Sequence, residues 1–399
     1  MKVWIVDQNA NLTYYAYSLA LGLAENGCEV AIVTRADYQW VNESHEHKKI
    51  SILESFLPIS MRLIKRFSFF QRFQFLRMLI KSIEYPFGYI SFFINYLKNQ
   101  PDVIHFQYAN IPIVELVVFK ILRLKKKCFL YTAHNLVPHR KITANDFFYP
   151  LVYQQISHFI VHSHKNKEDF HQFYKIPLES IEVIPHGNYN AYIDNEETTQ
   201  QEARQELGLS PDRKIVLFFG IIFKFKGLEY LISAMNRVRV DPDPLLLIVG
   251  KPIEGFGDYD RKIKALGLDN MIRKCLEYVS NHELSLYFKA ADIVALPYTR
   301  TTQSGVILTA FSFGKPVIAT SVGSFPETVI QGETGYLVPP CDEESLGQAI
   351  TDILNDGEKL KEMGCAAKRH SDEVYDWVHI GKKTMKLYQK ILEDKNRQF

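Results

Sequence analysis

The sequence has little of what marks secreted, membrane-spanning or nucleic-acid-binding chains. Its five cysteines are scattered over 399 residues, are odd in number and lack metal-ligand spacing, which fits a reducing cytoplasm and not a disulfide framework. No run of about twenty uninterrupted apolar residues occurs, so we expect no transmembrane helix. The N-terminus reads as a strand and not as a signal peptide. A net charge of only +2 gives no electrostatic case for nucleic acid as a partner.

Two common nucleotide-binding loops are also missing. The first turn, residues 8–12, contains no glycine and does not match Gly-x-Gly-x-x-Gly, so we do not expect a nicotinamide enzyme. No Gly-x-x-x-x-Gly-Lys-Ser/Thr loop occurs, which removes the common nucleotide hydrolases. His162 and His164 lack a third ligand at suitable spacing, so we expect no zinc site.

Continuous apolar strands alternate with helical segments, and this pattern runs twice. We expect strands at 2–7, 28–34, 103–107, 128–132 and 157–162, and again at 214–219, 244–249, 292–296 and 316–320. Uninterrupted apolar strands are typical of parallel sheets that helices cover on both faces. The sequence therefore predicts an α/β fold with two Rossmann-like, doubly wound domains facing a cleft, at 1–188 and 189–372. A C-terminal helix, 373–399, is expected to cross back to the first domain.

Two turns in the second half suit a diphosphate. Lys226 ends the turn 220–227, after a strand and before a helix, where its charge can reach phosphate oxygens. Ser304, Gly305 and Val306 start another helix after a strand, and the first turn of a helix offers main-chain N–H groups and partial positive charge. Taken singly, each turn has a plainer interpretation, as a solvated lysine or as an ordinary capped helix. Lys224 is a weaker second cation, because it can equally point to water.

The first half places histidines at or near strand ends. His134 follows a strand directly, where open parallel sheets present their ligands. A neutral histidine there can hydrogen-bond a sugar hydroxyl or stabilise developing charge, and a purely structural histidine is the alternative. We also name Asn11 in the first turn, His139, and His186 near the domain join as residues of the acceptor site or cleft.

One segment, Ser55 to Ile83, has no acidic residue at all. It interleaves six cations with phenylalanines. The functional interpretation is a helix that lies on an anionic membrane surface. The alternative is a core helix whose cations reach outward to water. The cations are Arg62, Lys65, Arg66, Arg72, Arg77 and Lys81, and the phenylalanines are Phe56, Phe67, Phe69, Phe70, Phe73 and Phe75.

Several blocks occur together in an order that resembles the retaining GT-B glycosyltransferases of family four, over nearly the whole chain. They are 220–227, 291–297, 314–320, 323–327 and 335–338. The resemblance implies the GT-B fold, a nucleotide-sugar donor in the C-terminal domain and an acceptor held mainly by the N-terminal one. It implies no metal, because a lysine and a helix dipole neutralise the departing diphosphate. By the resemblance, His134 matches the histidine that contacts the donor sugar.

The chain departs from the family at the two glutamates that usually contact donor sugar and ribose. Thr301 and Thr309 stand in their places, and Ile221 stands where many members have an arginine. A subgroup with Gln-Ser-Gly resembles this chain at Gln303, Ser304 and Gly305. The resemblance thus implies donor contacts from Lys224, Thr301, Gln303 to Val306, and Thr309.

These observations predict an enzyme that moves a hexose from a nucleotide sugar to a hydroxyl with retention of configuration. The acceptor is expected to be a glycan or a lipid-linked saccharide at the cytoplasmic face of a membrane, in surface polysaccharide or glycolipid assembly. Two alternatives stay open. A GT-B nucleotide-sugar epimerase would bind the same donor, and a non-catalytic nucleotide-sugar sensor would tolerate the missing glutamates.

Overall fold

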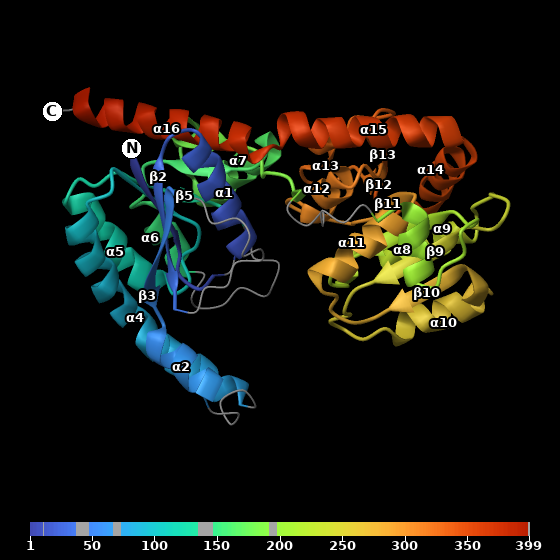
Figure 1. Cartoon of the computed structure of the whole chain (residues 1–399), viewed down its shortest axis with the longest axis horizontal. Coiled ribbons are helices and arrows are strands. Elements are labelled where there is room, and N and C mark those ends of the chain that lie inside the picture. The colour runs from blue at the N-terminus through green and yellow to red at the C-terminus, as the bar shows by residue number, and fades with distance from the viewer. Residues whose placement is uncertain (11, 37–47, 67–72, 135–146, 191–197, 398–399) are drawn as a thin grey trace. The chain divides into compact units, whose positions relative to one another are not determined.

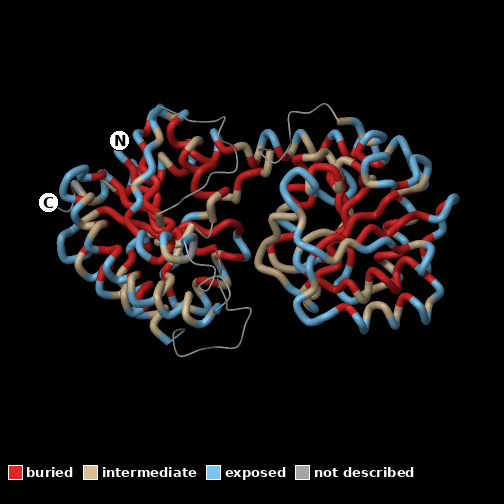
Figure 2. The backbone as a smooth tube through the Cα atoms, turned by 60° about the horizontal axis from the view of Figure 1, so that its bottom comes forward, coloured by how far each residue is buried: buried red, intermediate tan, exposed pale blue. Residues whose placement is uncertain are grey.

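The computed structural model of the chain describes residues 1–10, 12–36, 48–66, 73–134, 147–190 and 198–397. They form two compact units, Met1–Gly187 with Trp377–Phe399, and Asn188–Asp376 (Figure 1). In each unit a parallel sheet lies among helices, and Figure 2 shows buried backbone, in red, gathered inside each unit, with exposed backbone, in pale blue, around it. The predicted α/β fold with two Rossmann-like domains is confirmed. Asn11 and His139 lie outside the described residues.

Unit 1 is built on a seven-stranded sheet in the order β3-β2-β1-β4-β5-β6-β7. Its strands are β1 (Lys2–Asp7), β2 (Glu29–Arg35), β3 (Ile50–Phe56), β4 (Val103–Phe106), β5 (Phe129–Thr132), β6 (Phe159–Val161) and β7 (Ile181–Val183). The helices of the unit are α1 (Thr13–Glu25), α2 (Pro58–Arg66), α4 (Gln74–Asn99), α5 (Pro112–Leu124), α6 (Tyr149–Tyr153), α7 (His164–Tyr174) and α16 (Trp377–Arg397), with the 3-10 turn η3 (Leu178–Ser180).

Unit 2 has a six-stranded sheet in the order β10-β9-β8-β11-β12-β13. Its strands are β8 (Ile215–Phe219), β9 (Leu245–Val249), β10 (Ile272–Cys275), β11 (Ile293–Leu296), β12 (Val317–Thr320) and β13 (Gly335–Val338). Its helices are α8 (Gln200–Glu206), α9 (Leu228–Met235), α10 (Gly257–Ala265), α11 (Asn281–Ala290), α12 (Gly305–Ser312), α13 (Phe325–Thr328), α14 (Glu343–Asn355) and α15 (Gly357–Val374), with 3-10 turns η5 (Lys224–Lys226) and η6 (Asp269–Met271).

The basic segment 55–83 is not one helix. Ser55 and Phe56 end strand β3 and are buried, so they are not part of a helix over this segment. Helix α2 follows, and α4 begins at Gln74 and continues to Asn99, which is well beyond the end of the basic segment at residue 83. Phe56 is buried because its ring packs in the core against Tyr85 and Tyr89 of α4, at ring-centroid distances of 5.7 and 5.1 Å.

Helices α1 and α16 of unit 1 cross at two glycines (Figure 1). A Cβ atom built on Gly22 would lie 1.9 Å from the Trp377 carbonyl oxygen. A Cβ atom built on Gly381 would lie 2.2 Å from the Gly22 carbonyl carbon. Both neighbours are backbone atoms, which cannot rotate aside as a side chain would. The chain's C-terminal helix is therefore seated on α1 by direct backbone contact.

The crossing predicts that Gly381→Ala lowers the free energy of unfolding of unit 1 by about 1–3 kcal/mol, the usual cost of forcing a methyl group into a packed contact. The three tryptophans stand at positions 4, 40 and 377, all within unit 1, so urea unfolding followed by tryptophan fluorescence reports on this unit. Gly357→Ala is the control, because a Cβ atom there meets no heavy atom within 4 Å. Equal stability of Gly381→Ala and the parent would contradict the packing.

Candidate functional site

The strand order of unit 2 defines where a ligand can enter. From β8 the chain proceeds to β9 and β10 on one side, and then returns to place β11 and β12 on the other side. Neighbouring connections therefore diverge at β8 and β11. Doubly wound sheets bind ligands in a crevice at the carboxyl ends of such strands, and we call this position the β8–β11 crevice. The two turns that the sequence singled out follow β8 and β11, so the fold brings them to this one crevice.

The turn that carries Lys226 is fixed against the end of β11. Gly227 has φ +66°, and a Cβ atom there would lie 1.9 Å from the Pro297 carbonyl oxygen. The main-chain N–H of Thr299 donates to the Phe225 carbonyl at 2.8 Å. Only glycine allows this contact with such a backbone conformation, so residue 227 sets the position of the lysine before it.

Lys226 is almost buried, at 9% exposure. Nζ lies 5.4 Å from the centre of the Tyr298 ring. A Cβ atom built on Gly220 would lie 3.0 Å from Nζ and 3.8 Å from Cγ2 of Val306, which places the ammonium beside the start of α12. Among the residues that the structure describes, no carboxylate forms an ion pair with Lys226. A buried cation without a counter-charge is costly, and an anionic ligand would remove that cost.

Ser304 caps the amino end of α12. Its Oγ accepts a hydrogen bond from Val306 N at 3.3 Å and lies 3.4 Å from the Tyr298 hydroxyl. The cap uses one of the N–H groups of the first turn, and the helix dipole adds partial positive charge at the same end. Lys226, Tyr298, Ser304 and Val306 therefore form one connected positive site at the β8–β11 crevice.

In the part of the chain that the structure describes, the other side chains predicted to contact the nucleotide-sugar donor form no hydrogen bond with Lys226 or Ser304. The Lys224 side chain is exposed, and Gln303 is half-buried. The Thr301 hydroxyl donates to the Gln303 carbonyl at 2.8 Å. Thr309 is 6% exposed, and its hydroxyl donates to Gly305 O at 2.9 Å within the helix. The roles assigned to these residues stay predictions. Tyr298 was not singled out from the sequence, although it follows a predicted strand directly.

Unit 1 has its own divergence point, between β1 and β4. Gln8 follows β1 and is fully buried, and its Nε2 donates to the Tyr89 hydroxyl at 3.0 Å and to Tyr108 O at 3.1 Å. The Tyr89 hydroxyl donates in turn to Glu115 at 3.1 Å. Burial raises the pKa of Glu115 to about 7, which the hydrogen bonds from Tyr85 and Tyr89 partly offset. This carboxyl joins α4 to the loop that follows β4, where Ile111 N donates to it at 3.0 Å.

Histidines from four strand ends gather in the same unit. His134 Nδ1 lies 3.2 Å from Nε2 of His162, and its Nε2 lies 2.9 Å from Gln107 Oε1. The Tyr15 ring packs edge-on to His134 at 4.6 Å and lies 5.0 Å from His186. His105 contacts Tyr388 and Thr132, each at 2.6 Å. Sequence reasoning named the histidines near strand ends but not their mutual contacts, because these depend on the strand order.

Burial keeps this group of histidines neutral. It lowers the pKa of His105 and His162 to about 3 and that of His186 to about 4. For His134, burial and then the neighbouring His162, His186 and His105 hold the pKa well below its ordinary value. Both ring nitrogens of His134 have protein partners, so a sugar hydroxyl would have to replace Gln107 at Nε2. The contact with the donor sugar stays a prediction.

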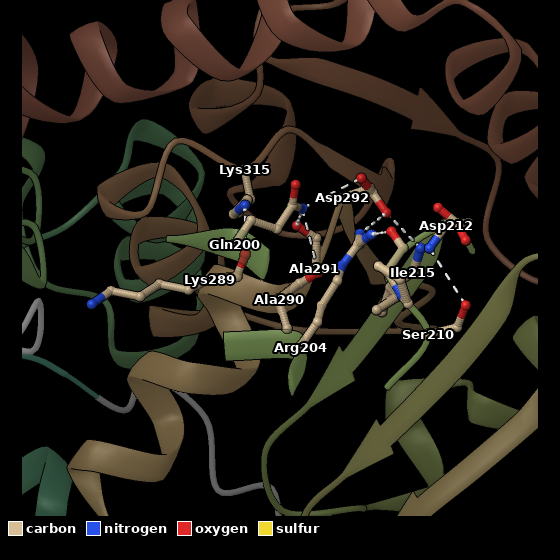
Figure 3. Close-up of polar contacts among 11 residues, drawn as sticks. Gln200, Arg204, Ser210, Asp212, Ile215, Lys289, Ala290, Ala291, Asp292 and Lys315 are labelled. Carbon is tan, nitrogen blue, oxygen red and sulfur yellow. Dashed lines mark hydrogen bonds and ion pairs between the residues drawn. The ribbon is translucent and has the colours of Figure 1, made fainter. Parts of the chain in front are cut away.

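At the opposite, amino-terminal edge of the unit 2 sheet, polar side chains bind the main-chain carbonyls at the end of α11 (Figure 3). Arg204 donates to Ala290 O at 3.0 Å and to Asp292 Oδ2 at 2.8 Å, and Lys315 donates to Lys289 O at 3.0 Å. Cations that bind the last carbonyls of a helix complement its dipole. Asp292 and Lys315, which stand in two of the sequence blocks, thus have a structural role at the edge away from the crevice.

A pocket of about 830 Å³ opens over this amino-terminal edge, between the strand starts and α15, and is lined by Asp292, Lys315 and Lys361 among others. Its size suits a ligand, but parallel sheets present ligands at the other edge, and its polar floor is taken up by the α11 contacts. We therefore place the candidate site at the β8–β11 crevice. Within the described ranges, no three side chains of His, Cys, Asp or Glu group as a metal ion requires.

Comparison with known proteins agrees with the fold. Residues 199–370 match the family described as Glycosyl transferases group 1, and residues 12–188 match Glycosyltransferase Family 4. The chain is similar in structure to sucrose-phosphate synthase from Thermosynechococcus elongatus, with TM-score 0.72, 21% identity, and 99% and 100% of the two chains covered. It is also similar to HepE of Anabaena in complex with UDP and glucose, with TM-score 0.70, 20% identity, and 98% and 100% covered.

A curated relative is D-inositol 3-phosphate glycosyltransferase of Corynebacterium glutamicum (strain R), 29% identical over 243 residues. The match covers 59% of this chain and 58% of that relative, so it spans little more than half of either. The two family matches follow one another along the chain, and one falls on each of the two sheets. The C-terminal half of the chain is therefore similar to the group 1 glycosyltransferases and the N-terminal half to Glycosyltransferase Family 4, on two Rossmann-like units as in the GT-B fold.

Proposed function

We propose that this chain transfers a hexose from a nucleoside-diphosphate sugar to a hydroxyl of a glycan or lipid-linked saccharide, with retention of anomeric configuration. The observation that carries the proposal is Lys226, a nearly buried ammonium without a carboxylate partner among the described residues. It lies beside the amino end of α12, and both lie at the point where the strand order diverges. A cation next to unpaired main-chain N–H groups is the arrangement that binds phosphates.

In the proposed reaction, Lys226 and the start of α12 bind the two phosphates and stabilise the charge that grows on the leaving oxygen. The bond from the sugar C1 to that oxygen breaks, and the acceptor oxygen bonds to C1 from the same face. The acceptor proton passes to the leaving phosphate, so no protein base is required. Hydrogen-bond donors that point at the charge developing in the transition state usually contribute most to lowering the barrier of such a reaction. We propose no metal, since the ammonium and the helix dipole supply the positive charge.

For the donor we propose Lys224, Thr301, Gln303 and Thr309 as further contacts, and for the donor sugar His134. Structures of the related HepE hold UDP, glucose and UDP-glucose, which supports a nucleotide sugar as the donor here. Thr301 and Thr309 carry hydroxyls where carboxylates would contact sugar and ribose, so we expect each contact to be a single hydrogen bond.

The test is turnover. The protein is incubated with UDP-, GDP- and ADP-hexoses, with and without oligosaccharide or lipid-linked acceptors, and release of nucleotide is measured together with the anomeric configuration of the product. We expect slow donor hydrolysis without acceptor, faster release with it, and a product that keeps the donor's configuration. Nucleotide binding without any turnover would favour the sensor, and a change of the sugar at one carbon without transfer would favour the epimerase.

We further propose that unit 1 docks on an anionic lipid surface through the outer face of α4, at the cytoplasmic face of the membrane. Large apolar side chains spaced along this helix face water. The exposed residues are Phe75 (79%), Ile83 (60%), Phe87 (63%), Ile90 (58%) and Leu97 (70%). No helix among the described residues is long and apolar enough to cross a bilayer, so we propose that α4 lies on the lipid surface.

The charges around α4 favour anionic lipid. Arg62 and Arg66 of α2 are exposed, as are Lys120 and Arg123 of α5. The acid Glu84 lies on α4 itself. Glu84 accepts hydrogen bonds from Ile59 N and Ser60 N at 2.7 Å each, so its charge is used at the start of α2. Clustered cations next to an apolar face are the features by which proteins recognise such membranes.

The membrane proposal predicts that the protein floats with vesicles rich in phosphatidylglycerol and is largely released at high salt, because salt screens the charge attraction. The triple variant Phe75→Ser, Ile83→Ser, Phe87→Ser should lose most of this binding. Ile253→Ser is the control, since Ile253 is 54% exposed but lies in unit 2. Failure of the parent protein to float, or equal flotation of the triple variant, would rule out α4 as the docking face.

A further inference from the structure

A chain of ring nitrogens in unit 1 connects Ile184 to Gln107 through two histidines. His162 Nδ1 lies 3.0 Å from the Ile184 carbonyl oxygen. His162 Nε2 lies 3.2 Å from His134 Nδ1, and His134 Nε2 lies 2.9 Å from the Gln107 side-chain amide. All of these rings are buried, with His134 at 6% and His162 at 8% exposure. Water therefore has little access to the ring nitrogens of these two histidines as an alternative hydrogen-bond partner.

The end at Ile184 fixes the direction of every bond. A carbonyl oxygen can only accept, so His162 must carry its hydrogen on Nδ1. A neutral imidazole has one N–H, which leaves a lone pair on His162 Nε2. His134 must then donate from Nδ1 to that lone pair. As a result, His134 Nε2 also has a lone pair, and the group that faces it must be a donor.

The other assignments of hydrogens are less favourable. If His162 carried hydrogen on Nδ1 and His134 on Nε2, the lone pairs of His162 Nε2 and His134 Nδ1 would face each other at 3.2 Å and repel. If both rings carried hydrogen on Nε2, the lone pair of His162 Nδ1 would face the Ile184 oxygen at 3.0 Å and repel it. If His162 were doubly protonated, all three contacts could form, but a charge would be buried. Burial and the neighbouring His186 lower the pKa of His162 to about 3, so the charged ring is not present at neutral pH.

Gln107 completes the chain. In the structure, the Gln107 Oε1 faces His134, and the Gln107 Nε2 is buried without a hydrogen-bond partner among the residues that the structure describes. The two ends of an amide have nearly the same shape, so hydrogen-bond partners decide which end faces His134. With the amide nitrogen toward His134, the unpartnered N–H₂ group gains an acceptor and the chain of bonds is consistent from end to end.

We propose that Gln107 and His162 are positioning residues that hold His134 in the tautomer with hydrogen on Nδ1 and a lone pair on Nε2. The functional consequence rests on the proposed contact between His134 and the donor sugar. A hydroxyl that replaces the Gln107 amide at Nε2 has to donate its hydrogen, so the site selects a sugar hydroxyl oriented as a donor. The tautomer itself is a property of the unliganded protein.

The tautomer is measured directly by long-range ¹H–¹⁵N correlation on the full chain labelled with [¹⁵N]histidine at pH 7.5, with the His134 signal identified by its loss in His134→Gln. A protonated ring nitrogen resonates far from an unprotonated one, and the coupling pattern tells Nδ1 from Nε2. We expect hydrogen on Nδ1 in both His134 and His162. Hydrogen on Nε2 of His134, or a doubly protonated ring, would overturn the proposal.

A matched pair of variants tests His162. In His162→Gln the side-chain amide reaches the former Nε2 position, where its oxygen can accept from His134, so the tautomer should be kept. In His162→Asn the amide stays at the former Nδ1 position and His134 loses its partner, so its signal should move toward the mixture of tautomers seen for free histidine. In Gln107→Glu the ionised carboxylate can only accept at Nε2, so at a pH where it is ionised it should move the hydrogen of His134 to that atom. Identical tautomers in both His162 variants would contradict the positioning role.

Activity separates positioning from folding. We expect kcat/KM of His162→Gln to stay within about threefold of the parent and that of His162→Asn to fall roughly tenfold, the value of about one hydrogen bond. Equal losses in both variants would mean that His162 has only a structural role. A parent protein without transferase activity would contradict the proposed function, whereas the tautomer measurement would still decide the hydrogen positions.

Discussion

Replacing Lys226 by alanine is expected to lower kcat for sugar transfer by roughly 10²–10³-fold, the usual effect of removing one group that stabilises charge in the transition state. The reason is its position. The ammonium lies beside Gly220 and the start of α12 and is 9% exposed, so water can only partly replace it. Because the charge on the leaving diphosphate grows as the C1–O bond breaks, the loss should fall mainly on kcat and less on KM.

The measurement compares initial rates of nucleotide release for the parent, Lys226→Ala and Lys264→Ala, with unfolding curves to confirm that all three fold. Lys264 is an exposed lysine of α10 and removes the same charge from the surface of the same unit. We expect the control to keep the parental rate. If Lys226→Ala also transfers sugar at that rate, the leaving-group site has been placed in the wrong part of unit 2.

We expect the free energy of unfolding of unit 1 to fall steeply as the pH is lowered below 6.5, because the unit buries neutral histidines. His105, His134 and His162 are buried, and burial holds their pKa values far below 6.5, to about 3 for His105 and His162. Below pH 6.5 the unfolded chain binds a proton at each of them and the folded chain does not. Stability therefore falls as pH falls, by about 1.4 kcal/mol per pH unit for each histidine, until the folded pKa is reached.

Glu115 acts in the opposite direction. Its pKa is raised to about 7, so between about pH 7 and 4.5 the folded state binds the extra proton and gains stability as pH falls. Burial also lowers the pKa of His186 to about 4, so four histidines oppose one carboxyl and the net slope is that of about three histidines. From pH 6.5 to pH 5 we expect unit 1 to lose roughly 6 kcal/mol of its free energy of unfolding. That is a large part of the stability of an ordinary domain.

Guanidinium unfolding followed by tryptophan fluorescence at pH 8, 7, 6 and 5 measures this slope, because all three tryptophans belong to unit 1. His162→Gln, which removes one buried imidazole, should reduce the slope by about 1.4 kcal/mol per pH unit. His379→Gln is the control at an exposed position and should leave it unchanged. A flat profile between pH 6.5 and 5 would mean that the histidines titrate in the folded state.

How far the fold could be predicted from the sequence depends on burial. The nine strands expected from uninterrupted apolar runs are all present. The four strands that were not named are β3, β7, β10 and β13, and each lies at an edge of its sheet. An edge strand is covered less completely, so it can carry polar residues, as Arg273 and Lys274 do in β10. A continuous apolar run is the wrong signal for such strands.

The candidate site was predictable in its turns but not in its contacts. Lys226 and the Ser304 turn stand out because each is a short stretch with a glycine between a strand and a helix. Their meeting depends on β11 pairing with β8, which no local pattern reveals. Tyr298 and the histidine chain depend on strand order for the same reason. Conversely, Asp292 and Lys315 stand in prominent blocks, yet their contacts serve the end of α11.

A crystal structure of the chain with a nucleoside diphosphate such as UDP tests the central claim most directly. The account predicts diphosphate oxygens within hydrogen-bond distance of Lys226 Nζ and of the main-chain N–H groups that begin α12, at the carboxyl ends of β8 and β11. A nucleotide bound at the amino-terminal edge, against Asp292 and Lys315, or at any place that leaves Lys226 without an anionic partner, would contradict it.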